Sequence, residues 1–342
     1  MLAALLIAPG RLEVKEVPDP VCPQGGVLVE VKACGICTSD VKMAQKGHRA
    51  LVYPRILGHE VAGVVEESKN EEFKAGDRVQ LAPGLRCGNC VACKRKADNQ
   101  CESRGIFGFT HDGGFAEYVA VPLEGPVMGS LNPLPEGLSF EQAALAEPVA
   151  CCINAQELAG LLPEDSALII GGGPMGYLHA LLARHKGAER TMVSETNRRR
   201  QDVALETESR VIDTETEDLF QAVMEETQGR GVDLLILACS EVILNQSLLK
   251  LLAPRGRVSL FSGVPADVSQ VRIDLNFIHY QEIRIVGSYG STAAQNAEAI
   301  RMISSGELSV EGLVTNIVDL DRIWEGLEYT ASRKGMKTVV EV

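Results

Sequence analysis

The sequence predicts an α/β protein of two domains, one β-rich and one built as a doubly wound parallel sheet. At 342 residues the chain exceeds the length at which a single hydrophobic core usually stops growing. Short β-like segments punctuated by glycine and proline run from residue 11 to about residue 122. From about residue 167 to residue 287, apolar strand-like segments alternate instead with stretches of helical length. These patterns assign the two folds to different parts of the chain.

The first pattern consists of short strands. Residues 27–31 alternate in hydropathy, residues 61–65 are apolar, and residues 76–81 begin at a turn. Residues 1–8 are apolar but lack a basic region and lead into Pro9-Gly10, so we expect a first strand rather than a secretory signal. A domain of this kind carries its chemistry in loops.

The second pattern predicts strands at 167–170, 191–194, 233–238, 257–261 and 283–286, with helices such as 177–185 and 244–252 between them. Repeated strand, helix and strand imply right-handed crossovers and a parallel sheet with helices on both faces. Residues 293–304 form a further predicted helix, and short β-like pieces follow. We expect this last part of the chain to return to the first domain.

Composition and charge exclude several classes of protein. A net charge of -13 argues against a nucleic-acid partner, which requires a basic face. No uncharged apolar run reaches the 18 residues of a membrane helix, so we expect no membrane partner either. Four of the ten cysteines lie close together at metal-like spacing, which favours reduced thiols and a cytoplasmic location.

A glycine-rich loop follows the strand at 167–170 and opens a helix. Its sequence, Gly171-Gly172-Gly173-Pro174-Met175-Gly176, matches G-x-G-x-x-G. Gly171 permits the tight turn, Gly173 lets a pyrophosphate approach the backbone, and Gly176 lets helix and strand pack closely. The amides at the helix start then face the phosphates. We predict a dinucleotide site, the alternative being a structural turn without a ligand.

An acidic residue is expected about twenty positions further on, to bind the adenosine ribose. Glu195 follows the strand at 191–194 and occupies that place. A carboxylate there favours NAD, because it repels the additional phosphate of NADP. Arg198, Arg199 and Arg200 follow at once and attract such a phosphate, which leaves NADP as the alternative.

Four cysteines form the most specific motif of the chain. Cys87, Cys90, Cys93 and Cys101 have the spacing C-x2-C-x2-C-x7-C, which can close a tetrahedral cage around zinc. Such a cage leaves no coordination position for a substrate, so we predict a structural zinc. The alternatives are a disulfide pair and an iron-sulfur cluster.

A second set of metal-binding side chains lies in two loops. One loop carries Cys37, Ser39 and Asp40, and the other carries His59 and Glu60. A catalytic zinc keeps three protein ligands and one open position. The two loops therefore predict a second, catalytic zinc site.

The order of these motifs, with Glu147-Pro148 between the quartet and the glycine loop, resembles the medium-chain zinc-dependent alcohol dehydrogenase family. The resemblance covers essentially the whole chain. It is greatest to the branch of sorbitol, galactitol-phosphate and threonine dehydrogenases, because Glu147 stands where other branches have a cysteine ligand. It implies a GroES-like β-rich zinc catalytic domain of residues 1–150 and 290–342, a Rossmann NAD-binding domain of residues 151–289, and a homodimer or homotetramer.

The resemblance also implies roles for individual residues. Cys37, His59 and either Glu147 or Glu60 bind the catalytic zinc, and Ser39 hydrogen-bonds the alcohol. The residues matching the cofactor site are Gly171, Gly173, Pro174, Met175, Gly176, Glu195 and Arg200. All of these stand as expectations for the structure.

The chain departs from the family pattern at two places. Lys42 replaces a histidine that ends the proton relay in many relatives, and Ser288, beside Tyr289, replaces an arginine of sorbitol dehydrogenases. His48 and His111 lie in loops that flank the site, and we interpret both as surface or packing residues.

We therefore predict a zinc-dependent oxidoreductase that transfers a hydride between NAD(H) and a secondary alcohol or ketone. A polyol, sugar alcohol or sugar phosphate is the expected small-molecule substrate. The alternatives are an amino alcohol such as threonine, and a cyclitol or aminocyclitol. A cofactor sensor or structural protein without turnover is a further class, against which the intact Cys37, Ser39, His59 and Glu147 argue.

Overall fold

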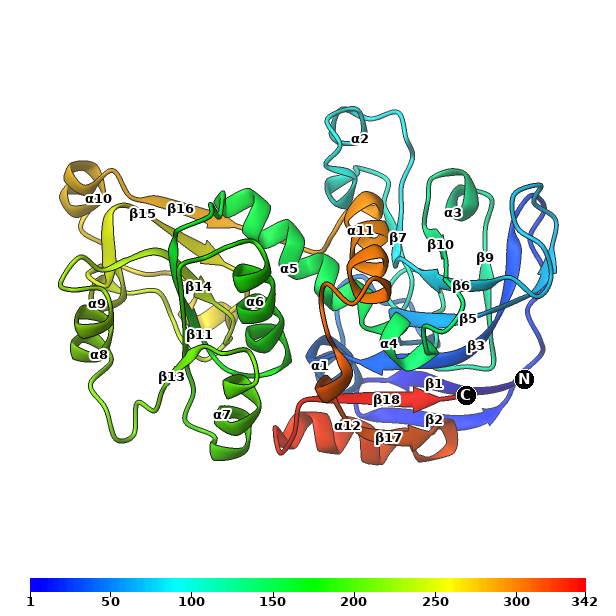
Figure 1. Cartoon of the computed structure of the whole chain (residues 1–342). Coiled ribbons are helices and arrows are strands. Elements are labelled where there is room, and N and C mark those ends of the chain that lie inside the picture. The colour runs from blue at the N-terminus through cyan, green and yellow to red at the C-terminus, as the bar shows by residue number, and fades with distance from the viewer. The chain divides into compact units, whose positions relative to one another are not determined.

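A computed structural model describes all 342 residues of the chain. The chain forms two compact units, Met1–Ala150 with Gly290–Val342 (unit 1) and Cys151–Tyr289 (unit 2). Both chain ends lie in unit 1 (Figure 1). Helix α5 (Ala146–Ala159) spans the boundary in sequence. Helices and strands together confirm the predicted α/β class.

The main sheet of unit 1 has seven strands in the order β10-β6-β5-β3-β18-β17, with β9 also paired to β3. Its members are β3 (Val27–Ile36), β5 (Glu60–Ser68), β6 (Arg78–Leu81), β9 (Tyr118–Val121), β10 (Leu131–Pro133), β17 (Val314–Asp319) and β18 (Lys337–Glu341). Strand β3 extends beyond the predicted residues 27–31. The register shifts between Val31 and Ala33, and this irregularity interrupts the alternation on which the prediction depends.

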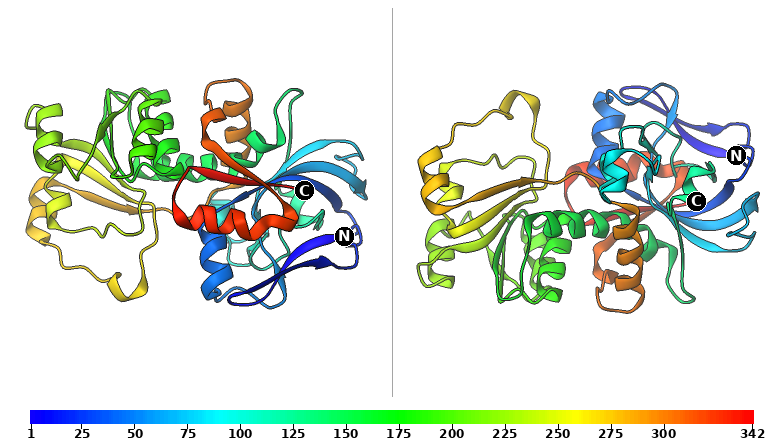
Figure 2. Two further views of the ribbon diagram at one scale, coloured as in Figure 1. Left: turned by 90° about the horizontal axis from the view of Figure 1, so that it is seen from below. Right: turned by 90° about the horizontal axis from the view of Figure 1, so that it is seen from above.

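Unit 1 also contains a three-stranded sheet, a short two-stranded sheet and six further helices. The strands are β1 (Leu2–Ala8), β2 (Arg11–Glu16), β4 (Arg55–Ile56), β7 (Gly84–Leu85) and β8 (Gly105–Ile106). The helices are α1 (Thr38–Lys46), α2 (Val91–Lys94), α3 (Glu124–Val127), α4 (Phe140–Ala144), α11 (Ala293–Ser304) and α12 (Ile323–Ser332). Helix α12 packs against β17 and β18 (Figure 2), so the C-terminal segment completes unit 1.

One hydrophobic core holds unit 1 together. It combines buried side chains of β1, β3 and β5 with those of α1 and α12, and includes the fully buried Phe107 and Phe115. Trp324 of α12 donates its indole N–H to the Leu12 carbonyl at 3.3 Å, so the single tryptophan anchors this packing. The loops at the ends of β3 and β5 therefore rest on a rigid support.

Unit 2 is a six-stranded parallel sheet in the order β13-β12-β11-β14-β15-β16. The strands are β11 (Ser166–Ile170), β12 (Arg190–Ser194), β13 (Arg210–Ile212), β14 (Val232–Leu237), β15 (Leu252–Leu260) and β16 (Arg284–Gly287). The helices are α6 (Pro174–His185), α7 (Arg198–Leu205), α8 (Leu219–Glu226), α9 (Gln246–Leu249) and α10 (Leu275–Gln281).

Both faces of this sheet are covered. Successive side chains of a strand point to opposite faces, and in β11 Ala167 and Ile169 join one hydrophobic cluster while Leu168 and Ile170 join another. The first cluster includes residues of α6 and α7, and the second includes residues of α8 and α9. Burial on both sides explains the continuous apolar run and confirms the doubly wound fold.

Two elements of unit 2 differ from those predicted from the sequence. The predicted helix 244–252 is too long: α9 has four residues, because Leu252 already pairs with Val232 as the first residue of β15. Strand β13 was not predicted. It is three residues long and begins with the exposed Arg210, so its apolar pattern is too short to indicate a strand. None of the helices has the length and apolar character needed to cross a bilayer.

Candidate active site

Three side chains predicted as zinc ligands meet in unit 1. The Cys37 Sγ, a ring nitrogen of His59 and a carboxylate oxygen of Glu60 lie within 4.8 Å of one another. Pairing of β3 with β5 causes this, because Gly35 near the end of β3 stands opposite Glu60 at the start of β5. Cys37 and His59, next to those positions, are thereby brought together.

Asp40 joins the two loops. Its side chain accepts a hydrogen bond from the Cys37 backbone N–H at 2.8 Å and caps α1, while its other oxygen lies 3.3 Å from His59 Nδ1. Burial alone would lower the pKa of His59, but the charges of Asp40 and Cys37 outweigh it, so the pKa is raised. With Nδ1 facing this carboxylate, the ring presents Nε2 to a metal.

Lys337 is a site residue that the sequence analysis missed. It lies on β18, is buried, and its ammonium donates to Glu60 Oε1. Burial raises the pKa of Glu60 more than Lys337 lowers it, and Glu60 in turn raises the pKa of Lys337 against the effect of burial. The available signal was a charged residue, Lys337, two residues before the apolar pair Val339-Val340 of a strand-like segment.

Glu147 and Ser39 complete the surroundings. Glu147 lies outside the group of three ligand atoms but close enough to raise the pKa of both Glu60 and Lys337. Ser39, in the first turn of α1, has a buried hydroxyl with no hydrogen-bond partner. Lys42, one turn further along α1, is exposed. Of the two glutamates expected as alternative zinc ligands, Glu60 is thus the one that groups with Cys37 and His59.

The donor set fits a catalytic zinc. One sulfur, one imidazole nitrogen and one carboxylate oxygen are a common ligand type for this metal, and three ligands leave one position open. Oε2 of Glu60 is buried and has no hydrogen-bond partner, as expected of an oxygen directed toward a cation. Ser39, two residues after Cys37, offers a further buried polar group without a partner.

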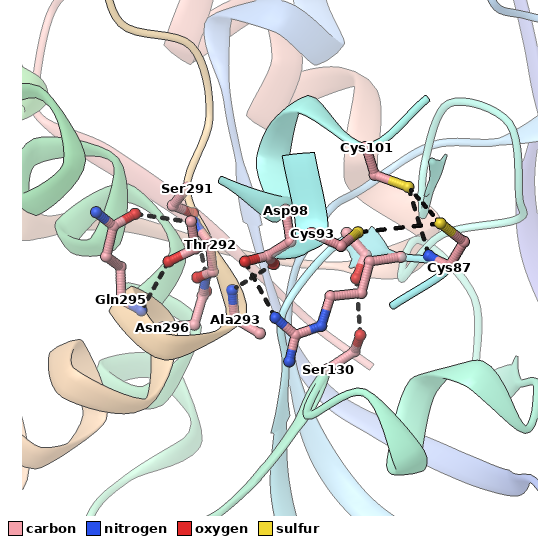
Figure 3. A network of polar contacts seen from close by, with 12 residues as sticks. Cys87, Cys93, Asp98, Cys101, Ser130, Ser291, Thr292, Ala293, Gln295 and Asn296 are labelled. Carbon is pink, nitrogen blue, oxygen red and sulfur yellow. Dashed lines mark hydrogen bonds and ion pairs between the residues drawn. The ribbon is translucent and has the colours of Figure 1, made fainter. Parts of the chain in front are cut away.

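The cysteine quartet forms a separate site in unit 1, partly shown in Figure 3. The distance from Cys87 Sγ to Cys101 Sγ and that from Cys90 Sγ to Cys93 Sγ are both 3.5 Å, and two further pairs lie at 3.9 and 4.0 Å. Thiolates bound to one zinc are about 3.8 Å apart, whereas a disulfide is about 2 Å long. The geometry fits a zinc cage and excludes the disulfide alternative.

Asp98 attaches this lobe to the rest of unit 1 (Figure 3). It lies in the short 3-10 helix Asp98–Gln100, just before Cys101. Its carboxylate pairs with Arg86 at 3.0 Å and accepts the Ala293 N–H of α11 at 3.1 Å. The lobe that carries the quartet is therefore joined to α11 through this carboxylate.

The glycine loop of unit 2 has the close contacts that its sequence predicts. A Cβ on Gly176 would lie 1.7 Å from the Gly171 carbonyl oxygen, so only glycine permits this packing. Gly171 has a φ of +101°, a conformation that favours glycine. Gly173 is the N-cap of α6, with Pro174 as the first helical residue. The loop thus leaves the amides at the start of α6 open to a phosphate.

Glu195 and Arg200 both lie against this loop. Glu195 accepts hydrogen bonds from the backbone N–H of Gly172 at 2.9 Å and of Thr196 and Asn197 at 2.8 Å. The Arg200 guanidinium would lie 3.1 Å from a Cβ on Gly173. The structure therefore brings the predicted acidic and basic residues to the edge of one site.

Comparison with known proteins gives the family. Residues 23–129 match the alcohol dehydrogenase GroES-like domain, and residues 174–305 match the zinc-binding dehydrogenase domain. The chain is 32% identical to L-threonine 3-dehydrogenase of Pyrococcus horikoshii, over 99% of this chain and 98% of that protein. The chain belongs to the medium-chain zinc-dependent alcohol dehydrogenase family. It is thus a zinc-containing oxidoreductase that uses a nicotinamide cofactor.

Two further proteins, one curated relative and one solved structure, resemble this chain over most of its length. L-galactonate-5-dehydrogenase of Escherichia coli is 29% identical over 90% of this chain and 88% of its own length. A zinc-binding dehydrogenase structure from Sinorhizobium meliloti with bound NADP superposes with a TM-score of 0.91 at 27% identity, covering 100% of this chain and 99% of that one. The fold, a GroES-like unit with a Rossmann unit, is confirmed for this dehydrogenase.

Proposed function

We propose that this dehydrogenase oxidises a secondary alcohol of a polyol, sugar alcohol or sugar phosphate to the ketone, with NAD as hydride acceptor. The observation that carries the proposal is the convergence of Cys37, His59 and Glu60 on one point, with one ligand position left open. Relatives that act on threonine and on L-galactonate support a polar, hydroxylated substrate.

The protein's own residues hold the metal and move the proton. Cys37, His59 and Glu60 would bind the zinc, with Glu147 as the second available carboxylate, and Asp40 fixes the His59 ring. When bound, zinc supplies the Lewis acidity that lowers the pKa of an alcohol. The Ser39 hydroxyl has no other partner and would accept a hydrogen bond from the substrate hydroxyl, relaying its proton onward toward solvent.

NAD is the proposed cofactor because of Glu195. Its carboxylate is held by the backbone amides of Gly172, Thr196 and Asn197, which supports a role in repelling a 2'-phosphate. Arg200 beside Gly173 supports binding of the pyrophosphate. NADP is the alternative, supported by the NADP-bound relative and by the exposed Arg198 and Arg199. The ratio of kcat/KM for the two cofactors distinguishes them.

One substrate screen tests the proposal. Reduction of NAD is followed with polyols, sugar phosphates, amino alcohols and cyclitols, with and without a zinc chelator. Turnover of polyols that the chelator abolishes supports the proposal. Selective turnover of threonine would favour the second candidate, an amino-alcohol dehydrogenase. The 32% identity to L-threonine 3-dehydrogenase supports this candidate.

A substitution tests the assigned site. Cys37→Ser should abolish turnover, while binding of NAD to unit 2 should persist, because the two sites use different residues. Full activity in this variant would contradict the proposal.

We also infer a homodimer or homotetramer in which β16 pairs with β16 of a second copy. β16 is an edge strand that pairs only with β15, and Ile285 on it is 37% exposed. Leu275 and Tyr280 of α10 are 75% and 77% exposed. An open apolar edge favours pairing with its own copy about a two-fold axis. Light scattering of the protein and of Ile285→Pro should show a multimer and a monomer, respectively.

We place the protein in a reducing compartment such as the cytoplasm. No cysteine forms a disulfide, and the proposed zinc ligands require reduced sulfur. Fractionation of the cells that produce the protein tests this location.

A further inference from the structure

A stretch of chain without acidic residues connects the two loops of the metal site. Residues 41–58, called here the basic segment, contain no aspartate or glutamate. Their four cations are Lys42, Lys46, Arg49 and Arg55. In the whole chain, by contrast, 46 acidic residues outnumber 33 lysines and arginines. The basic segment begins directly after Asp40 and ends directly before His59, so its cations are close in sequence to both loops of the site.

Three of the four cations are available to a ligand. Lys42, Lys46 and Arg49 are exposed and make no hydrogen bond or ion pair within the chain. Arg55 differs, because it pairs with Asp112 at 2.8 Å. Single exposed lysines are ordinary on protein surfaces, but three unpaired cations within eight residues of an acidic protein are a local excess of charge.

His48 fixes the position of this segment relative to the metal site. Its ring packs edge-on against Phe109 at a centroid distance of 5.6 Å, and Phe109 packs edge-on against His59 at 5.5 Å. The two imidazole rings are therefore at most about 11 Å apart. The facing ring edges are closer than the centroids, so a sugar-sized molecule with one carbon at the metal site can approach the His48 ring.

The polar atoms of His48 are oriented for an acceptor. Its Nδ1 accepts the Ala50 backbone N–H at 3.2 Å, which leaves the proton of a neutral ring on Nε2. The side chain is exposed, so this N–H can donate to a ligand. His48 thus adds a donor between the exposed cations and Phe109.

The carboxylates of the site do not neutralise the basic segment. Asp40, Glu60 and Glu147 are 0%, 1% and 8% exposed; Asp40 faces His59, Glu60 faces Lys337, and Glu147 acts on the same buried pair. Asp112 is engaged with Arg55. Lys42, Lys46 and Arg49 therefore keep positive charges without an ion-pair partner, in a chain whose net charge of -13 would otherwise repel an anion.

We propose that the basic segment binds an anionic group, a carboxylate or a phosphate, at the end of the polyol substrate that the proposed function requires. Arg49 and Lys42 supply the charge, with the planar Arg49 able to bind two oxygens at once, and His48 supplies the neighbouring donor. The substrate class is accordingly a sugar acid or a sugar phosphate rather than a neutral polyol.

Three probes that differ chiefly in their terminal group test this inference: L-galactonate, galactitol phosphate and galactitol. Calorimetry in the presence of NAD should show that at least one anion binds about tenfold more tightly than galactitol, the effect of one charge-assisted hydrogen bond. The double variant K42Q/R49Q should lose this preference and bind galactitol as the unchanged protein does. Lys74→Gln removes an equally exposed cation from another loop and should change nothing.

The outcomes separate this inference from the function on which it rests. Preference for L-galactonate identifies the carboxylate, and preference for galactitol phosphate identifies the phosphate. Equal binding of all three probes, no binding of either anion, or an unchanged preference in K42Q/R49Q would overturn the inference. If the anions bind with the expected preference but NAD is never reduced, the proposed function is contradicted. If galactitol alone is oxidised, the proposed function stands and the inference is overturned.

Discussion

The ammonium of Lys337 donates to the carboxylate of Glu60, 277 residues away in sequence, and the two side chains are 5% and 1% exposed. Through this contact the last strand of the chain fixes a carboxylate at the metal site. It also explains why Glu60 tolerates burial, because an ion without a partner in such a place is strongly unfavourable. A Cβ on Gly35 would lie 1.9 Å from Glu60 Oε2, so the same carboxylate also requires glycine beneath it.

Replacing Lys337 by methionine should destabilise unit 1. In metal-free protein at neutral pH, Lys337→Met leaves Glu60 buried without its partner, and we expect a loss of about 3–5 kcal/mol in the free energy of unfolding. Fluorescence of Trp324, the single tryptophan, reports this unfolding in denaturant. Adding Glu60→Gln should recover most of the loss, because both charges are then absent. A loss below about 1 kcal/mol in the single variant would show that the pair is not coupled as described.

The two zinc sites should respond differently to the loss of one ligand. Cys93→Ser should remove one zinc per chain and lower the melting temperature of unit 1 by roughly 4–8 °C, given a cost of about 2 kcal/mol and about 2–4 °C per kcal/mol. Cys37→Ser should also remove one zinc but leave the melting temperature within a few degrees. Metal analysis measures the zinc content, and calorimetry measures the melting temperature. A larger drop in melting temperature for Cys37→Ser than for Cys93→Ser would contradict the assignment of the quartet as the structural site.

Two glycines of the cofactor loop should differ when changed to alanine. Gly176→Ala places a methyl group against the Gly171 backbone, so unit 2 should fail to fold. Gly173→Ala meets only the end of the Arg200 side chain, at 3.1 Å, and its backbone conformation suits alanine, so the protein should fold. NAD binding should still fall at least about tenfold, because the methyl group stands where the pyrophosphate approaches. Binding of NAD by Gly173→Ala with full affinity would refute this placement.

Much of the architecture was predictable because its signals are local. The strand at 167–170 is apolar on both faces, and the glycine loop and the cysteine quartet are continuous in sequence. The family follows from the order of such motifs, and the comparisons confirm it. The individual site residues stay predictions, although the structure brings Cys37, His59 and Glu60 together.

What the sequence did not reveal depends on long-range pairing. Lys337 reaches the site only because β18 pairs with the far end of β3, and Phe109 contacts two histidines from other loops. Neither residue belongs to a motif. The predicted length of α9 was wrong for a similar reason. The last residue of the predicted helix, Leu252, belongs to β15 because it pairs with β14.

A buried histidine of unit 2 should make stability depend on pH. His179 lies fully buried in α6, edge-on to Phe261 at 4.5 Å, and burial, with the nearby charge of Lys186, lowers its pKa to about 3. In the unfolded chain its pKa is about 6.5. Below pH 6.5 the unfolded chain therefore takes up a proton that the folded chain does not accept until about pH 3. This proton lowers the free energy of unfolding by about 1.4 kcal/mol per pH unit, or about 2 kcal/mol at pH 5, and has no effect above pH 6.5.

Circular dichroism in urea at pH 7 and pH 5 should show this difference between the unchanged protein and His179→Asn, which does not titrate. All other groups titrate alike in the two proteins, so an identical pH dependence would mean that His179 is protonated inside the folded unit.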